Sequence, residues 1–184
     1  LSVNNSKILP SRPVCLKNKV VVVDGIVGGG KGLMSALVGA LPKVEMWVHR
    51  PKIEQICAMH HLGHLSFEGA VSLLKMWIDE EAYNLSMVRD INCRPSDMSS
   101  IFKDARPFRY IKRFLMQGGA DALNRVINDE LVVNLMTHSN TGFASPLFHA
   151  LGNRLVYVRL TRCPMNEYML NHLERWSKRW GNDI

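Results

Sequence analysis

Residues 19–33 constrain the fold of this chain more than any other stretch, because they join a strand pattern to a glycine-rich turn. Val20–Val23 are four consecutive β-branched residues, which is typical of a strand buried on both faces. After the turn, residues 33–41 place apolar side chains at helical spacing. Glycines let backbone N–H groups approach an anion, and a helix N-terminus adds favourable partial charge. The stretch therefore predicts a strand, an anion-binding loop and a helix.

The turn has the spacing of a phosphate-binding loop, Gly25-x-x-x-x-Gly30-Lys31-Gly32. In nucleotide hydrolases a serine or threonine follows the lysine and binds Mg²⁺ beside the β- and γ-phosphates. Gly32 stands in that place here. We therefore expect the loop and Lys31 to hold an anion without this metal ligand. The alternative interpretation is a tight turn that binds nothing.

Length and composition fit one domain with its own core. The chain has 184 residues, 47% of them hydrophobic, and a formal net charge of +7. This charge suits an anionic ligand, and no DNA- or RNA-binding motif accompanies it, so we expect no nucleic-acid partner. The four cysteines are widely spaced without a C-x-x-C pair, which indicates neither a zinc site of that kind nor a disulfide framework.

The pattern of apolar runs predicts the fold class. Residues 1–18 are expected to be an irregular lead-in, and residues 19–184 a single α/β domain. Three strong strand runs, which should neighbour one another, lie at residues 20–24, 131–137 and 155–161. A weaker strand is expected at 43–49, and helices at 33–41, 53–62, within 65–88, from about 107, at 120–128, 146–151 and 165–178. Strands alternating with helices predict a three-layer α/β/α architecture with a central parallel sheet.

Two groups of polar residues in the first part of the chain have more than one interpretation. His60 and His64 are four residues apart and can share a metal, but a zinc-protease helix needs glutamate where His61 stands. We interpret them as partly exposed histidines near a helix end and expect no metal site. The basic residues within 103–116 form either a solvated helix face or a wall for an acidic acceptor or a phosphate.

The later strands end in residues that suit chemistry. Ligands of open parallel sheets lie beyond the carboxyl ends of strands, and the strand at 131–137 leads into His138. Histidine titrates near neutral pH and suits general acid–base catalysis, although His138 can instead cap the next turn. The strand at 155–161 leads into Arg162, whose guanidinium can hold a phosphate bidentately.

Taken in order, these motifs resemble the sulfotransferases that use 3′-phosphoadenosine 5′-phosphosulfate. The set comprises the glycine loop, Met-Thr-His-Ser at 136–139, Pro-Leu-Phe-x-x-Leu-Gly at 146–152 and Leu-Val-Tyr-Val-x-x-x-Arg-x-Pro at 155–164. The resemblance covers about residues 19–178. It implies a P-loop NTPase-like fold and transfer of a sulfuryl group from that nucleotide to an acceptor hydroxyl. The nucleotide is a co-substrate, and no metal is required.

The resemblance also implies roles for particular residues. The 5′ end of the donor would be held by Gly28, Gly29, Gly30, Lys31, Gly32 and Leu33. Lys31 would stabilise the leaving phosphate, and Arg162 would hold the 3′-phosphate. Asn171 would assist Arg162, because it adjoins Leu170, which stands where the family has a serine. The cytosolic branch implies His138 as the base, whereas the carbohydrate branch implies a glutamate near the place of Glu45.

Two other functions are also compatible with these motifs. A P-loop kinase or nucleotide hydrolase would need Mg²⁺ held by a loop hydroxyl and by an aspartate at a strand end, whereas the later strands lead into His138 and Arg162. A degenerate nucleotide-binding domain without catalysis is the third interpretation. The acceptor is expected to be a sugar, a lipid headgroup or a small alcohol. The sequence does not indicate an oligomeric state, and the lack of a signal peptide or apolar spanning run favours a cytoplasmic location.

Overall fold

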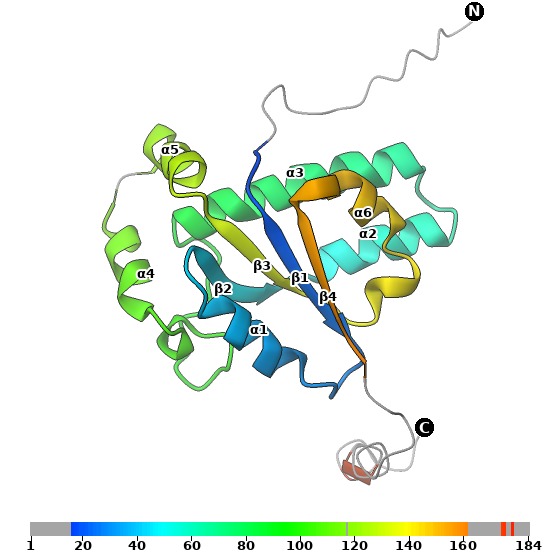
Figure 1. Ribbon diagram of the computed structural model, residues 1–184, viewed down its shortest axis with the longest axis horizontal. Coiled ribbons are helices and arrows are strands. Elements are labelled where there is room, and N and C mark those ends of the chain that lie inside the picture. Colours follow the sequence, from blue (N-terminus) through cyan, green and yellow to red (C-terminus); the bar gives the residue numbers. More distant parts are fainter. Residues whose placement is uncertain (1–15, 117, 162–173, 176–177, 179–184) are drawn as a thin grey trace, which may run out of the picture.

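The computed structural model describes residues 16–116, 118–161, 174, 175 and 178. Its centre is a four-stranded sheet with the order β2-β3-β1-β4, and all neighbouring strands are parallel (Figure 1). The strands are β1 (Val20–Gly25), β2 (Val44–His49), β3 (Val132–Met136) and β4 (Leu155–Leu160). The three strong runs of the sequence are thus confirmed as strands, and β1 lies between the other two.

The run of valines accounts for the central place of β1. Val20, Val22 and Val23 are completely buried, and Val21 is 8% exposed, so both faces of the strand are covered. Val22 lies opposite Leu135 of β3 and Tyr157 of β4. A β-branched residue at every position fits a strand that has a neighbour on each side and a helix layer on each face.

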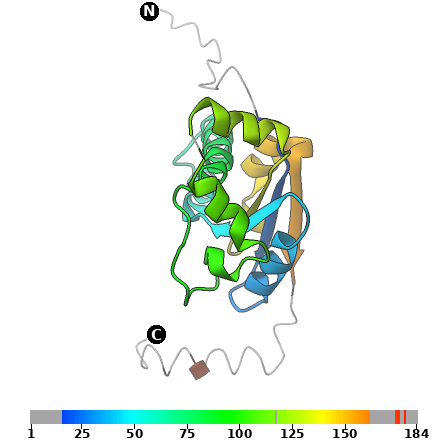
Figure 2. The ribbon, with the colours of Figure 1, turned by 90° about the vertical axis from the view of Figure 1, so that its left-hand side faces the viewer.

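Helices cover both faces of the sheet. One face is covered by α1 (Lys31–Gly39), which contacts β1, β2 and β3. The other carries α2 (Pro51–His61), α3 (Phe67–Ser86) and α6 (Ser145–Leu151), whose buried side chains form one core with Val20, Val22 and Leu135. Figure 2 shows α1 and α3 on opposite sides of the sheet. The expected three-layer α/β/α architecture is confirmed.

The remaining elements are short and lie around this frame. They are α4 (Pro107–Phe114), α5 (Ala120–Asn128) and the 3₁₀ turns η1 (Ile101–Lys103), η2 (Asn140–Gly142) and η3 (Gly152–Arg154). The bounds of α5 agree with the sequence prediction, whereas α1 and α2 each begin two residues earlier than predicted. Within the described residues, none of the helices has both the length and the apolar character needed to cross a membrane.

Local signals explain where the helices begin. Pro51 lies in the first turn of α2, where its missing N–H costs nothing and its fixed φ suits the helix. Ser66 precedes α3, and its hydroxyl accepts a hydrogen bond of 3.1 Å from the Gly69 N–H. Pro51 and Ser66 therefore account for where these two helices begin.

A substitution at Leu74 tests whether α3 stabilises the core that it forms with the sheet, α2 and α6. The Leu74 side chain is completely buried. We expect Leu74→Ala to lower the free energy of unfolding by about 2–5 kcal/mol, because it removes apolar contacts and leaves a cavity. Leu37→Ala is the matched control, since Leu37 of α1 is 57% exposed and its loss should change stability by less than about 0.5 kcal/mol. Urea denaturation measures both, and equal effects would contradict the packing described.

Candidate functional site

The candidate site lies along the edge of the sheet where the strands end, which we call the carboxyl edge. Because all four strands are parallel, the segments that follow β1, β2 and β3 meet there. The glycine loop 25–32 follows β1, His49 ends β2, and His138 lies two residues beyond β3.

Two glycines of the loop are required by its geometry. A Cβ atom on Gly25 would lie 2.7 Å from the carbonyl oxygen of Leu160, so a side chain there would force β1 and β4 apart. Gly30 precedes α1 with φ +92°, in the left-handed region that side chains rarely adopt. The loop therefore brings bare backbone close to both the end of β4 and the start of α1.

The side chain of Lys31 turns back into the loop. Its ammonium donates hydrogen bonds of 2.8 Å to the Gly25 carbonyl and 2.6 Å to the Ile26 carbonyl, and the residue is only 4% exposed. Burial lowers the pKa of Lys31, while the negative charges of Asp24 and Glu54 oppose that shift. Lys31 thus places a positive charge inside the loop, within the field of two carboxylates.

Asp24 ties the end of β1 to the segment after β3. Its carboxylate accepts hydrogen bonds from the Thr137 hydroxyl (2.8 Å), the Asn140 N–H (3.0 Å) and both the hydroxyl (2.5 Å) and N–H (3.1 Å) of Thr141. Burial by itself raises the pKa of Asp24, but these donors outweigh it and lower the pKa to about 2. Both oxygens of the carboxylate are thus used to hold His138 and its neighbours against the loop.

His138 lies in a cluster with two side chains that sequence reasoning missed, His49 and Glu54. The backbone N–H of His138 donates to Glu54 Oε1 at 2.8 Å, and the ring atom Nδ1 of His138 lies 3.3 Å from the same oxygen. His49 Nε2 lies 3.1 Å from His138 Nδ1 and 3.2 Å from Glu54 Oε1. The sequence did contain a signal for His49, because a residue that ends a parallel strand belongs at this edge. Nothing in the sequence marked Glu54.

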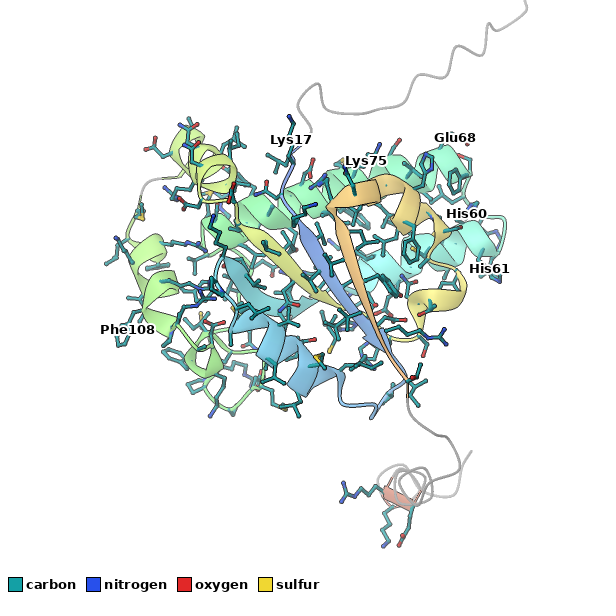
Figure 3. The ribbon with its side chains drawn as sticks, in the orientation of Figure 1. Lys17, His60, His61, Glu68, Lys75 and Phe108 are labelled. Atoms are coloured by element: carbon teal, nitrogen blue, oxygen red, sulfur yellow. The ribbon has the colours of Figure 1, made fainter. Side chains whose placement is uncertain are left out.

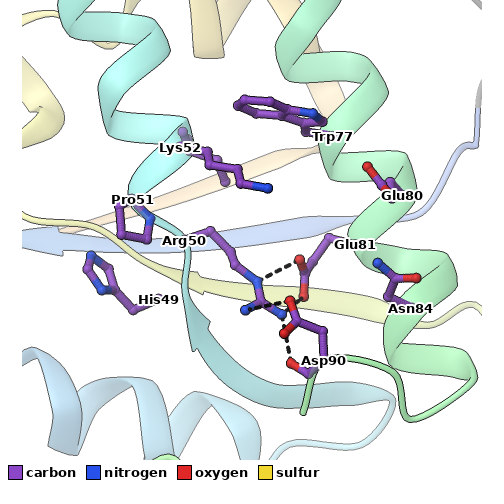
Figure 4. A pocket seen from close by; sticks show the side chains of 10 residues that line it. His49, Arg50, Pro51, Lys52, Trp77, Glu80, Glu81, Asn84 and Asp90 are labelled. Atoms are coloured by element: carbon purple, nitrogen blue, oxygen red, sulfur yellow. Dashed lines mark hydrogen bonds and ion pairs between the residues drawn. The ribbon is translucent and has the colours of Figure 1, made fainter. Parts of the chain in front are cut away.

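Two cavities flank this cluster. One, of about 230 Å³, lies where β1 and β4 end and is lined by Asp24, Gly25, Ile26, Thr141 and Arg159 among others. The second, of about 280 Å³, lies where β2 ends, between the start of α2 and α3 (Figure 4). Its walls include His49, Lys52, Trp77, Glu80 and Asn84. The His49 ring belongs both to this second cavity and to the cluster around His138.

Glu45 lies elsewhere. It is the second residue of β2, near the amino end of the strand, and is 1% exposed. Its carboxylate accepts hydrogen bonds from the Tyr110 hydroxyl at 2.9 Å and from the Arg113 guanidinium at 2.9 and 3.1 Å. Burial raises the pKa of Tyr110 strongly, and the charge of Glu45 adds to that shift. The structure therefore brings one of the two candidate bases, His138, to the carboxyl edge with the glycine loop.

Among the basic residues of 103–116, Lys103 and Lys112 are exposed, as a solvated face requires, whereas the arginines bind protein oxygens. The Arg106 guanidinium donates to the carbonyl oxygens of Gly39, Leu41 and Val44, at 3.0, 2.7 and 3.0 Å. Arg109 donates to the Val44 carbonyl as well, at 2.9 Å. These guanidinium groups hold the connection between α1 and β2 and bind protein carbonyls. The sequence did not indicate these hydrogen bonds, because the acceptors are backbone carbonyl groups that lie far from the arginines in the sequence.

The other predicted site residues are placed as follows. His60 and His61 lie at the end of α2 (Figure 3), where the His60 ring packs against Phe67 and the His61 ring against Phe143. Leu33 is 67% exposed in the first turn of α1. Arg162 and Asn171 lie outside the described residues.

Comparisons of the chain with protein-family models, with curated proteins and with solved structures gave no match.

The role of Asp24 leads to a pH-dependent prediction. Because the pKa of Asp24 is lowered in the folded protein, its contribution to stability is present above the usual value of 3.8 and is lost as the pH falls through about 2. We expect Asp24→Asn to lower the free energy of unfolding by about 2 kcal/mol at pH 7, with the difference shrinking between pH 4 and pH 2. Denaturation of both proteins across this range measures it.

Asp129→Asn is the control, because Asp129 is exposed at the end of α5 and should change stability little at any pH. An Asp24→Asn deficit that stays constant down to pH 2 would contradict the proposed hydrogen-bonded carboxylate.

Proposed function

We propose that this protein transfers a sulfuryl group from 3′-phosphoadenosine 5′-phosphosulfate to an acceptor hydroxyl. The observation that carries the proposal is that Lys31 of the glycine loop and His138 lie at the same carboxyl edge of the sheet. The charge of Glu54 acts on Lys31, and Glu54 Oε1 contacts the ring and the N–H of His138. A cation for the leaving phosphate and a base for the acceptor are therefore available at one edge of the sheet, where an in-line transfer needs both.

The cavity where β1 and β4 end supports a place for the donor. It adjoins Gly25 and Ile26 of the loop, whose backbone suits an anion, and Arg159 adds a positive charge to its wall. Lys31 reaches this phosphate by exchanging its two hydrogen bonds to loop carbonyls for bonds to phosphosulfate oxygens. Arg162, which follows Thr161 of the same cavity in sequence, keeps its role at the 3′-phosphate as an expectation from the resemblance.

The cavity where β2 ends supports a place for the acceptor. Its lining combines the Trp77 indole with hydrogen-bonding groups on Lys52, Glu80 and Asn84 (Figure 4). An aromatic surface beside polar groups suits a hydroxylated molecule such as a sugar, which presents both C–H and O–H groups. An acceptor in this cavity would meet the cluster at His49.

The chemistry follows from the cluster. When His138 Nδ1 carries the proton, its contact with Glu54 leaves the Nε2 lone pair free to take the acceptor's proton. The acceptor oxygen attacks sulfur, the bond from sulfur to the bridging oxygen breaks, and the phosphate leaves with that electron pair. Loop N–H groups and Lys31 stabilise the charge that develops there.

The kinase alternative is supported less well by the described residues. It needs oxygen ligands for Mg²⁺ from the loop and from a strand end, but position 32 is glycine and both oxygens of Asp24 already accept protein hydrogen bonds. Metal-free transfer makes no such demand. A nucleotide-binding domain without catalysis would use the same loop. It would be distinguished from a sulfotransferase by the absence of sulfated product in the turnover assay.

Lys31→Ala tests the donor site. We expect it to weaken binding of 3′-phosphoadenosine 5′-phosphate by about 1.5–3 kcal/mol, or roughly 10- to 150-fold, because it removes a charged hydrogen bond to the 5′-phosphate. Isothermal titration calorimetry measures this loss. Lys43→Ala is the matched control, since Lys43 precedes β2 at the amino edge and pairs with Glu130. ADP binding more tightly in the presence of Mg²⁺ would favour the kinase instead.

His138→Ala tests the base. We expect turnover to fall by roughly 10²–10⁴, the usual loss for a positioned base, with donor affinity nearly unchanged. The assay follows sulfated product with a panel of sugar and small alcohol acceptors. His61→Ala, at the end of α2, should keep full turnover. The base assignment would move to Glu45 if Glu45→Gln abolished turnover in folded protein while His138→Ala did not.

A further inference from the structure

We propose that His49, Glu54 and His138 form a binding site for a divalent transition metal such as Zn²⁺. The ligand atoms would be His49 Nε2, Glu54 Oε1 and His138 Nδ1. They are mutually separated by 3.1, 3.2 and 3.3 Å. Within the part of the chain that the structure describes, this is the group of three potential ligands that converges on one point.

The separations fit a metal centre. Two ligand atoms about 2.0–2.1 Å from a tetrahedral ion are about 3.3–3.4 Å apart, so the observed triangle needs only small adjustments to hold Zn²⁺. Two imidazole nitrogens facing each other at 3.1 Å can share one proton at most, whereas both lone pairs can point at a common cation.

The fold builds this site from three separate elements. His49 ends β2, Glu54 lies in the first turn of α2, and His138 follows β3. The Glu54 oxygen is oriented by the His138 N–H at 2.8 Å, which is the kind of outer contact that positions a metal ligand. The three side chains are 34%, 21% and 32% exposed, so an ion can enter and a water can complete the coordination.

The ligand set also selects the class of metal. Imidazole nitrogens suit Zn²⁺ and its neighbours, whereas Mg²⁺ requires oxygen ligands in octahedral geometry. The Glu54 charge offsets part of the cation's charge, and the nearby charge of Lys31 opposes binding. The site is therefore distinct from the Mg²⁺ site that a kinase would need.

Metal binding at this place has a regulatory consequence that rests on the proposed function. A His138 ring bound through Nδ1 carries its proton on Nε2, so it has no lone pair left for the proton of an acceptor. The ion also takes over Glu54, which orients the base. Occupancy by Zn²⁺ and base catalysis by His138 are thus mutually exclusive, and Zn²⁺ should inhibit the transfer.

The test is a titration of the full chain, without an added polyhistidine tag, with Zn²⁺ alone in a calorimeter. We expect binding of one ion per chain. His49→Ala and Glu54→Gln should each raise the dissociation constant at least about tenfold, the lower end of the loss seen when even an outer partner of a metal ligand is removed. Glu54→Gln keeps an oxygen that can accept the His138 N–H, so it separates metal binding from folding. His61→Ala should bind Zn²⁺ as the parent does.

The outcomes separate the two proposals. Absence of Zn²⁺ binding, or binding that is unchanged in both His49→Ala and Glu54→Gln, would overturn the metal site. Turnover of the parent should fall as Zn²⁺ occupies the site, while the remaining turnover of His49→Ala should not respond at the same concentration. Zn²⁺ binding with the expected variant pattern but without any sulfated product would leave the metal site standing and overturn the transfer.

Discussion

The arrangement of the carboxyl edge depends on one buried carboxylate. Asp24 is the next-to-last residue of β1 and accepts hydrogen bonds from the Thr137 hydroxyl and from the backbone of Asn140 and Thr141. A buried charge is costly unless donors surround it, and these donors come from the segment that carries His138. The same contacts that compensate the charge therefore fix the distance between the glycine loop and the histidine. With a neutral residue at position 24, the segment after β3 would lose this charged acceptor, while the backbone hydrogen bonds from Thr137 to Val23 and from Ser139 to Gly25 would remain.

A second buried carboxylate, that of Glu45, lies near the amino end of β2 and binds different partners. Glu45 is held by Arg113 and Tyr110, while Arg106 holds the nearby backbone. These arginines account for much of the positive charge between 103 and 116. Because their guanidinium groups already bind protein oxygens, the net charge of the sequence overstates what this stretch offers to an anionic ligand. At the carboxyl edge, by contrast, Lys31 binds only carbonyl groups of its own loop and can exchange them.

The sequence predicted the fold better than it predicted the site. Val20–Val23 and the apolar runs at 131–137 and 155–161 were recognisable because a fully buried parallel strand needs an unbroken apolar run. His138 was recognisable because it ends such a run. Glu54 was not, since a lone glutamate in the first turn of a helix usually interacts with that helix's own dipole. Its contact with His138 spans 84 residues and exists only once β2 and β3 have paired.

The sequence by itself determined the α/β alternation, the burial of the valine strand on both faces and the glycine loop that precedes α1. These features are local, because strand burial and glycine conformation are set by neighbouring residues. Only the tertiary structure decided which charged groups meet. It placed Glu45 with arginines near the amino end of β2 and gathered His49, Glu54 and His138 at the carboxyl edge. The physical reason is that parallel pairing sets the relative positions of strands that are far apart in the chain, and charges act over a few ångströms in space irrespective of their separation in sequence.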